Sequence, residues 1–132
     1  MTILVAYVAR PEGQAALDKG IEIATERKED LVVVNAGHGG QHEERGVLNG
    51  YEAENIQERL TALPIKAEFK QFVRGKNAVE EIKALVEQLH VSMLIIGLRG
   101  RSPIGKLLLG SVAQEILISA PCPVLAVKAG YL

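Results

Sequence analysis

The sequence has no tryptophan, and three tyrosines with two phenylalanines give an aromatic content of only 4%. So few aromatic side chains argue against a stacking platform for single-stranded nucleic acid. The 15 basic and 16 acidic residues give a formal net charge of −1, which lacks the basic excess of a general nucleic-acid binder. No nucleic acid is therefore expected among the partners of this protein.

Cysteine and long apolar runs are equally scarce. The single cysteine, Cys122, cannot form an internal disulfide, which fits the reducing environment of the cytoplasm. The apolar runs are far too short to cross a membrane, and residues 1–4 lack the basic segment that opens a secretory signal. We expect a cytoplasmic protein with no membrane partner, folded as one domain over residues 1–132.

Apolar runs alternate with helical periodicity along the whole chain. Short runs rich in β-branched residues predict strands at residues 3–8, 31–34, 65–72, 93–96 and 123–127. Apolar stripes at helical spacing lie between them and predict four helices, which contain Leu17, Ile21 and Ala24; Ala53, Ile56 and Leu60; Val79, Ile82 and Val86; and Val112, Ile116 and Ala120. This alternation predicts an α/β fold, namely a single-domain, open, parallel five-stranded sheet with helices on both faces. Such a doubly wound sheet binds ligands outside the carboxyl ends of its strands, where the strand order reverses.

Two predicted strands differ in how their side chains alternate. Residues 65–70 alternate between apolar and charged side chains, as expected for a half-exposed strand at a sheet edge. The last strand begins at Pro123, ends at Val127 and is apolar without alternation, and a bare apolar edge invites pairing with another chain. We therefore expect a homodimer through this strand; cover by the C-terminal tail or by a helix is the alternative.

The segment between Gly97 and Ser111 joins the fourth predicted strand to the last helix. It carries glycines at 97, 100 and 110, the basic residues Arg99, Arg101 and Lys106, and no carboxylate. A glycine-rich loop that leads into a helix N-terminus can hold an anion with its backbone N–H groups. The pattern predicts a phosphate or nucleotide site. A plain helix cap at Ser111 and turn geometry at the glycines explain the same residues without a ligand.

Two weaker patterns are not expected to bind ligands. Gly100-x4-Gly105-Lys106 follows the Walker A spacing, but Leu107 stands where a hydroxyl should bind magnesium. His38 and His42 lie four residues apart in a polar loop, and we expect solvated side chains there rather than a metal site.

The spacing Gly97-x2-Gly100-x9-Gly110-Ser111 resembles the motif G-x2-G-x9-G-[ST] of the nucleotide-binding universal stress proteins. Residues 107–113, 120–124 and 3–6 are similar to the same family. The resemblance implies a Rossmann-like fold of the adenine nucleotide alpha hydrolase type, with strand order 3-2-1-4-5. It also implies a regulatory role in the stress response.

A ligand is implied by the same resemblance, namely ATP or a related adenine nucleotide, with Mg²⁺ accompanying it. In this family the glycines and the following Ser or Thr hold the phosphates, while the ends of the first two strands border the nucleoside. The cofactor-binding residues implied for this sequence are Ala6, Tyr7, Val8, Ala36, Gly97, Arg99, Gly100, Arg101, Ser102, Gly110, Ser111 and Val112.

One position departs from the family pattern. Nucleotide-binding members usually carry an Asp after the first strand, whereas this chain has Val8, which cannot accept a hydrogen bond. Losing such a contact costs about 0.5–1.5 kcal/mol, or up to roughly tenfold in affinity. Two alternatives therefore stay open, a dimeric interaction protein that binds no nucleotide and a slow ATPase. Against an enzyme, no carboxylate or histidine is placed by motif to activate water.

Overall fold

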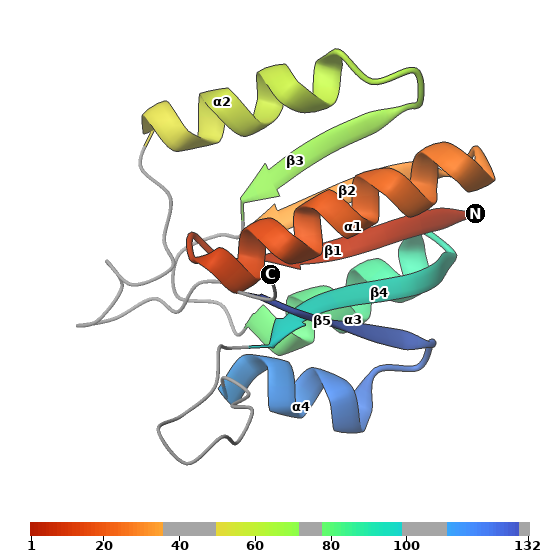
Figure 1. Cartoon of the computed structure of the whole chain (residues 1–132). Helices are drawn as coiled ribbons and strands as arrows, with labels where there is room; N and C mark the ends of the chain where they lie inside the picture. The colour runs from red at the N-terminus through yellow and green to blue at the C-terminus, as the bar shows by residue number, and fades with distance from the viewer. Residues whose placement is uncertain (36–49, 72–77, 99–110, 130–132) are drawn as a thin grey trace.

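The computed structural model describes residues 1–35, 50–71, 78–98 and 111–129 of the chain. Strands and helices alternate through these residues, as Figure 1 shows. In chain order they are β1 (Thr2–Tyr7), α1 (Pro11–Arg27), β2 (Asp30–Asn35), α2 (Gly50–Thr61), β3 (Ala67–Gln71), α3 (Ala78–Gln88), β4 (Val91–Leu98), α4 (Ser111–Ser119) and β5 (Val124–Lys128). Every predicted strand is present, with ends shifted by one or two residues.

The strands form one parallel sheet in the order β3-β2-β1-β4-β5. This order confirms the predicted doubly wound topology. Because all five strands run in the same direction, their carboxyl ends lie along one edge of the sheet, on the left in Figure 1. In register, Tyr7 of β1 lies opposite Asn35 of β2, and Asn35 lies opposite Gln71 of β3.

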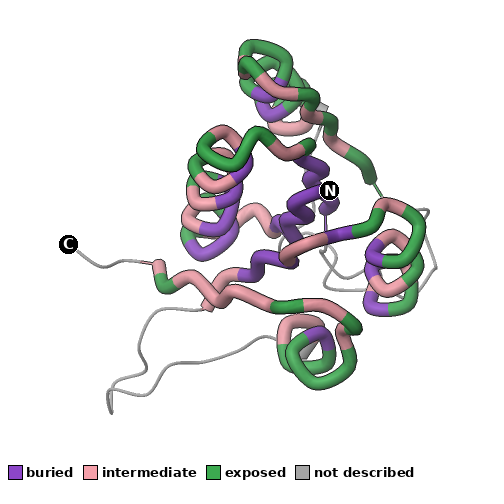
Figure 2. Tube along the Cα trace, turned by 90° about the vertical axis from the view of Figure 1, so that its right-hand side faces the viewer, coloured by how far each residue is buried: buried purple, intermediate pink, exposed green. Residues whose placement is uncertain are grey.

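Two apolar layers hold the helices against the sheet. Successive side chains of a strand point to opposite faces, so Ile3 and Val5 of β1 join the layer beneath α1 and α2, while Leu4 joins the layer beneath α3 and α4. Figure 2 shows the buried residues in the central strands and on the helix sides that face them. Cover on both faces explains why β1 and β2 are continuous apolar runs rather than alternating ones.

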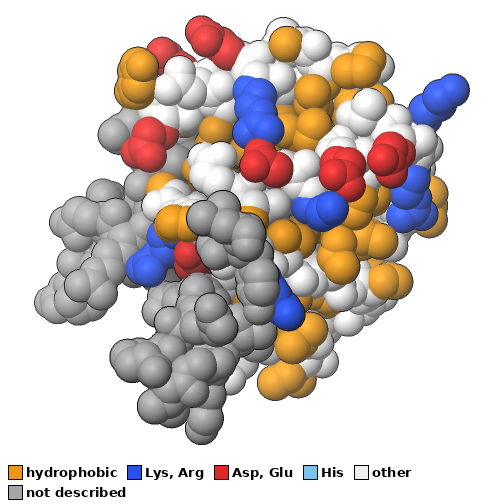
Figure 3. Space-filling view, viewed as in Figure 1, with side chains coloured by type: hydrophobic (Ala, Val, Ile, Leu, Met, Phe, Trp, Pro, Cys, Tyr) orange, Lys and Arg blue, Asp and Glu red, His pale blue; other side chains and the backbone are white. Residues whose placement is uncertain are grey.

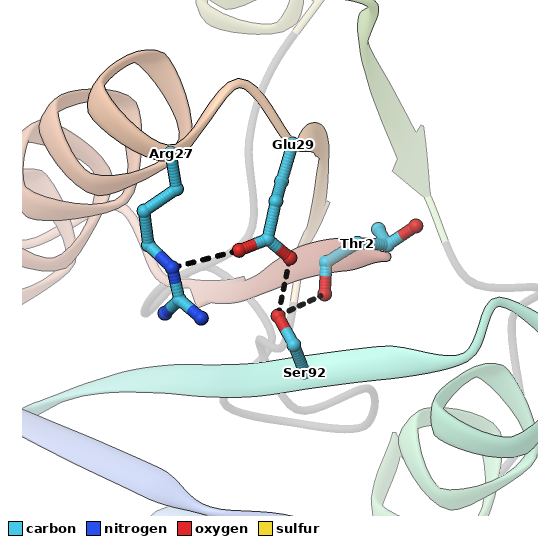
Figure 4. Close-up of polar contacts among 4 residues, drawn as sticks. All are labelled: Thr2, Arg27, Glu29 and Ser92. Carbon is cyan, nitrogen blue, oxygen red and sulfur yellow. Dashed lines mark hydrogen bonds and ion pairs between the residues drawn. The ribbon is translucent and has the colours of Figure 1, made fainter.

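A polar cluster ties the elements together at the opposite, amino-terminal edge of the sheet (Figure 4). The β1–β4 register shifts between Thr2 and Ile3, which leaves Ser92 as the extra residue of a bulge. The Ser92 hydroxyl donates to a Glu29 carboxylate oxygen at 2.5 Å, and the Thr2 carbonyl oxygen lies farther away at 3.4 Å. The other oxygen of Glu29 lies 2.8 Å from Nε of Arg27. The cluster therefore links the end of α1 to both β1 and β4.

Candidate functional site

The strand order reverses between β1 and β4. From β1 the chain builds outward through β2 and β3, then crosses to β4 and β5 on the other side. α1 and α2 cover one face of the sheet, and α3 and α4 cover the other. A doubly wound sheet binds its ligand at this reversal. The described parts of the candidate site are therefore the β1–α1 connection, the end of β4 and the first turn of α4.

The connection between β1 and α1 is short and tightly packed. The Arg10 N–H donates to the Val8 carbonyl oxygen at 2.8 Å, and Pro11 follows as the first residue of α1. A Cβ on Gly13 would overlap the Val8 carbonyl group, whose carbon would lie only 2.8 Å away. Glycine at 13 therefore allows α1 to begin this close to the strand end. Pro11 contributes no N–H donor to the helix N-terminus.

The end of β4 touches the first turn of α1. A Cβ on Gly97 would lie 2.6 Å from the Glu12 carbonyl carbon and 2.9 Å from the Glu12 Cβ. Such distances are well inside van der Waals contact, so no other residue fits at 97 unless α1 moves. The family resemblance implied that Gly97 borders a ligand. The structure shows that the absence of a side chain at 97 also makes room for Glu12.

Tyr7 is the last residue of β1, and its side chain is only 2% exposed. Its ring lies in the layer beneath α1 and α2, where its hydroxyl oxygen accepts a hydrogen bond from Nε2 of Gln14 at 2.8 Å. Burial raises the pKa of the Tyr7 phenol above its ordinary value, and the hydrogen bond from Gln14 partly offsets that effect. Since the ring is held in the core, a contact between Tyr7 and a ligand would come from its backbone.

The other predicted site residues divide into those inside and those outside the described part of the chain. Ala6 is buried, while Val8 and Val112 are half-buried and pack against the layer beneath α3 and α4. Ser111 is the first residue of α4, which therefore begins where the motif predicted a helix. The structure thus brings the ends of β1 and β4 and the start of α4 to one edge. The predicted residues outside the described part are Ala36, Arg99, Gly100, Arg101, Ser102 and Gly110.

Two buried polar residues at this edge were not expected from the sequence. Glu12 and Asn35 are each 8% exposed, and Asn35 lies beside Tyr7 at the end of β2. The burial of Asn35 could have been recognised in the sequence, because this polar residue directly follows an apolar run. The burial of Glu12 could not, since an acidic residue in the first turn of a helix is ordinarily exposed. Glu12 packs against Gly97, which is distant in the sequence.

Neither a metal centre nor a membrane-spanning helix is found in residues 1–35, 50–71, 78–98 and 111–129. Those residues contain no group of three or more His, Cys, Asp or Glu side chains suited to hold a metal ion. None of their helices is long and apolar enough to span a bilayer. His38 and His42 lie outside these ranges. Cys122 is half-buried against the layer beneath α3 and α4, and this burial raises the pKa of its thiol.

The two edge strands of the sheet, β3 and β5, are the ones that the sequence predicted. They differ in how well they are protected against pairing with a strand of another chain. β3 exposes Glu68 and Lys70, and charged side chains discourage pairing with another strand. Residues 124–127 of β5 are apolar and half-exposed, and no described strand pairs with their outer edge. On the same side of the molecule α4 exposes Leu117 and Ile118. Figure 3 shows apolar side chains below the row of charges on α1, toward β5 and α4.

Comparison with known proteins gives matches over nearly the whole chain. A sequence model described as the universal stress protein family matches residues 1–128. A universal stress protein from Mycolicibacterium smegmatis is 40% identical over 126 residues, which cover 96% of either chain. The solved structure of a universal stress protein from Archaeoglobus fulgidus has a TM-score of 0.74 and 25% identity, covering 96% of this chain and 97% of that one.

Two further solved structures contain nucleotides. A universal stress protein from Archaeoglobus fulgidus in complex with dAMP has a TM-score of 0.66 and 18% identity, covering 96% of each chain. A universal stress protein in complex with cAMP has a TM-score of 0.68 and 19% identity, covering 98% of each chain. At these identities the likeness concerns the fold.

Proposed function

The chain belongs to the universal stress protein family, and on that premise we propose that it binds ATP or a related adenine nucleotide. We propose a regulatory binding module of the stress response, located in the cytoplasm. The observation that carries the proposal is the position of the glycine motif. Gly97 lies next to the end of β4 and Ser111 opens α4, so the motif begins and ends at the strand-order reversal. The relatives solved with dAMP and cAMP support an adenine nucleotide as the ligand class.

The orientation of the ligand follows from a difference between two helix N-termini. α1 and α4 follow the two strands that meet at the reversal. At α1, Pro11 has no N–H to donate, and the buried carboxylate of Glu12 repels a second anion. Ahead of α4 the sequence supplies Arg99 and Arg101 and no carboxylate. We therefore assign the phosphates to the α4 side and the nucleoside to the side of β1 and β2.

Each predicted residue has a role in this proposal. Backbone N–H groups at Gly100, Gly110 and Val112 would bind phosphate oxygens, and the Ser111 hydroxyl would add a donor. Mg²⁺ would accompany a nucleotide with two or more phosphates and be held by phosphate oxygens and water. The remaining assignments are Gly97, Arg99, Arg101 and Ser102 to the phosphate side, and Ala6, Tyr7, Val8 and Ala36 to the nucleoside side.

Titration of the purified protein with ATP, ADP, AMP and cAMP tests the proposal, with native mass spectrometry to detect a nucleotide that copurifies. Ser111→Ala should weaken binding roughly two- to twelvefold, the value of one hydrogen bond. Ser119→Ala is the matched control, because Ser119 ends the same helix and its hydroxyl donates to the Glu115 carbonyl oxygen at 2.6 Å. Gly110→Val should abolish binding in a protein that still folds. No binding of any of the four at millimolar concentration refutes the proposal, and conversion of ATP to ADP would indicate the slow ATPase.

A dimeric interaction protein is the second candidate function, favoured by the apolar outer edge of β5. In this case the surface around β5 is the functional one and the nucleotide site is empty. Analytical ultracentrifugation at micromolar concentration distinguishes the two candidates when it is combined with the titration. A stable dimer that binds no nucleotide supports the second candidate, and a monomer refutes it.

A further inference from the structure

Glu12 is a buried acidic residue at the strand-order reversal, and the sequence analysis assigned it no role. Among the residues that the structure describes, it is the one charged side chain in the buried class, with 8% exposed. It is the second residue of α1, and its backbone contacts Gly97 across the boundary between β1 and β4. Carboxylates are rarely buried this deeply. The positive end of the α1 dipole stabilises a negative charge at this position.

The strand ends beside Glu12 offer few side chains that can accept a hydrogen bond. β1 ends with Tyr7, whose hydroxyl is engaged by Gln14, and Val8 follows with an apolar side chain. β4 ends with Gly97 and Leu98. Among the described residues, Glu12 is the buried charged residue, and its backbone and Cβ contact the end of β4.

We propose that the Glu12 carboxylate accepts hydrogen bonds from the ribose hydroxyls of the bound nucleotide and makes the site selective for ribonucleotides over deoxynucleotides. The inference rests on the proposed nucleotide site. Two carboxylate oxygens match two neighbouring hydroxyl donors, the 2′-OH and the 3′-OH. The same negative charge keeps phosphates away from α1 and thus sets the direction in which the nucleotide lies.

The contact between α1 and β4 supplies the rigidity that selectivity requires. Because Gly97 has no side chain, the Glu12 backbone packs directly on the end of β4. Because Gly13 has none, the same helical turn packs against the Val8 carbonyl group. Glu12 also takes part in an interaction within the chain, so ribose hydroxyls would share it or replace its present partner. For that reason we expect each hydrogen bond between a ribose hydroxyl and Glu12 to raise the affinity for the nucleotide about tenfold. This gain is at the lower end of the range for hydrogen bonds to charged groups.

Binding of AMP, 2′-deoxy-AMP and 3′-deoxy-AMP, measured by isothermal titration calorimetry, tests the proposal. The three ligands have the same base and the same charge. Repulsion between the Glu12 carboxylate and the phosphate is therefore equal for all three and cancels in the ratio of their dissociation constants. In the wild type AMP should bind about tenfold tighter than either deoxynucleotide. Glu12→Gln, which keeps the volume but removes the charge, should reduce this preference to roughly threefold or less, and Glu12→Ala should remove it.

Glu26→Gln is the matched control, because Glu26 is exposed near the other end of the same helix. It should retain the wild-type preference. A wild type that binds all three nucleotides equally overturns the inference and leaves nucleotide binding standing. Glu12 variants that lose affinity equally for all three ligands also overturn it, because that is the result of a purely structural role. Absence of binding to the wild type refutes the proposed function itself.

Discussion

Replacement of Gly97 by alanine tests the contact between β4 and α1 directly. The added Cβ would lie 2.6 Å from the Glu12 carbonyl carbon and 2.9 Å from the Glu12 Cβ. Carbon atoms pack at about 3.5–4.0 Å, so the first turn of α1 has to retreat by roughly 1 Å. Because the obstructing atoms are mainly backbone, rotation of a side chain cannot relieve the overlap. Overpacking costs about 1–3 kcal/mol, and we expect the free energy of unfolding to fall by about 2–3 kcal/mol.

Urea unfolding followed by circular dichroism measures this loss, and Gly20→Ala provides the comparison. A Cβ on Gly20 would overlap Cγ2 of Val5, a fully buried β-branched side chain with little rotamer freedom. Gly20 also lies inside α1, where alanine gains about 1 kcal/mol in helix propensity and offsets part of the crowding. The gain in helix propensity offsets only part of the crowding, so the Gly20 variant should lose about 1–2 kcal/mol, less than the Gly97 variant. A Gly97 variant as stable as wild type, or more stable than the Gly20 variant, would refute the reasoning.

Three further predictions concern the buried phenol of Tyr7, the polar cluster around Ser92 and the apolar edge of β5. Burial raises the pKa of the Tyr7 phenol in the folded protein. The neutral phenol therefore contributes fully to the free energy of unfolding below the pKa of the unfolded state, about 10. This contribution is lost as the pH rises through the pKa of the folded state. The advantage of wild type over Tyr7→Phe in urea unfolding should be constant below about pH 9 and shrink at higher pH; a constant difference throughout contradicts this. Ser92→Ala removes the 2.5 Å hydrogen bond to the Glu29 carboxylate and should lower the free energy of unfolding by about 1–3 kcal/mol, whereas no change would show that the cluster contributes nothing. Ala126→Lys on β5 should convert a dimer to a monomer in analytical ultracentrifugation, and Ala67→Lys on the opposite edge strand should not; equal behaviour of the two argues against a β5 interface.

The strands were predictable because their signals are local, whereas their order in the sheet was implied by the family resemblance. The apolar run at residues 31–34 is stable only as a strand covered on both faces, and it is the buried β2. Alternation at residues 65–70 predicted an exposed edge, and it belongs to the edge strand β3. Right-handed crossovers then leave few ways to arrange five parallel strands.

The ends of the glycine motif were also recognisable, since a motif depends on spacing along the chain. Gly97 is found next to the end of β4 and Ser111 at the start of α4, as the pattern predicted. The burial of Asn35 was open to prediction as well, because it follows directly on an apolar run. The sequence could not predict the contact between Gly97 and Glu12, because a glycine pattern does not show which distant residue packs against it.

Local patterns in the amino-acid sequence therefore determined the elements, and the family resemblance of its motif implied their order in the sheet and the place of the candidate site. Only the tertiary structure decided which residues far apart in the sequence meet, at that site and at the opposite edge of the sheet. Glu12 of α1 packs on Gly97, and Ser92 reaches Glu29 because the β1–β4 register shifts beside it. Periodicity and spacing are properties of neighbours along the chain. Excluded volume and hydrogen bonding act between atoms that are close in space, whatever their separation in sequence.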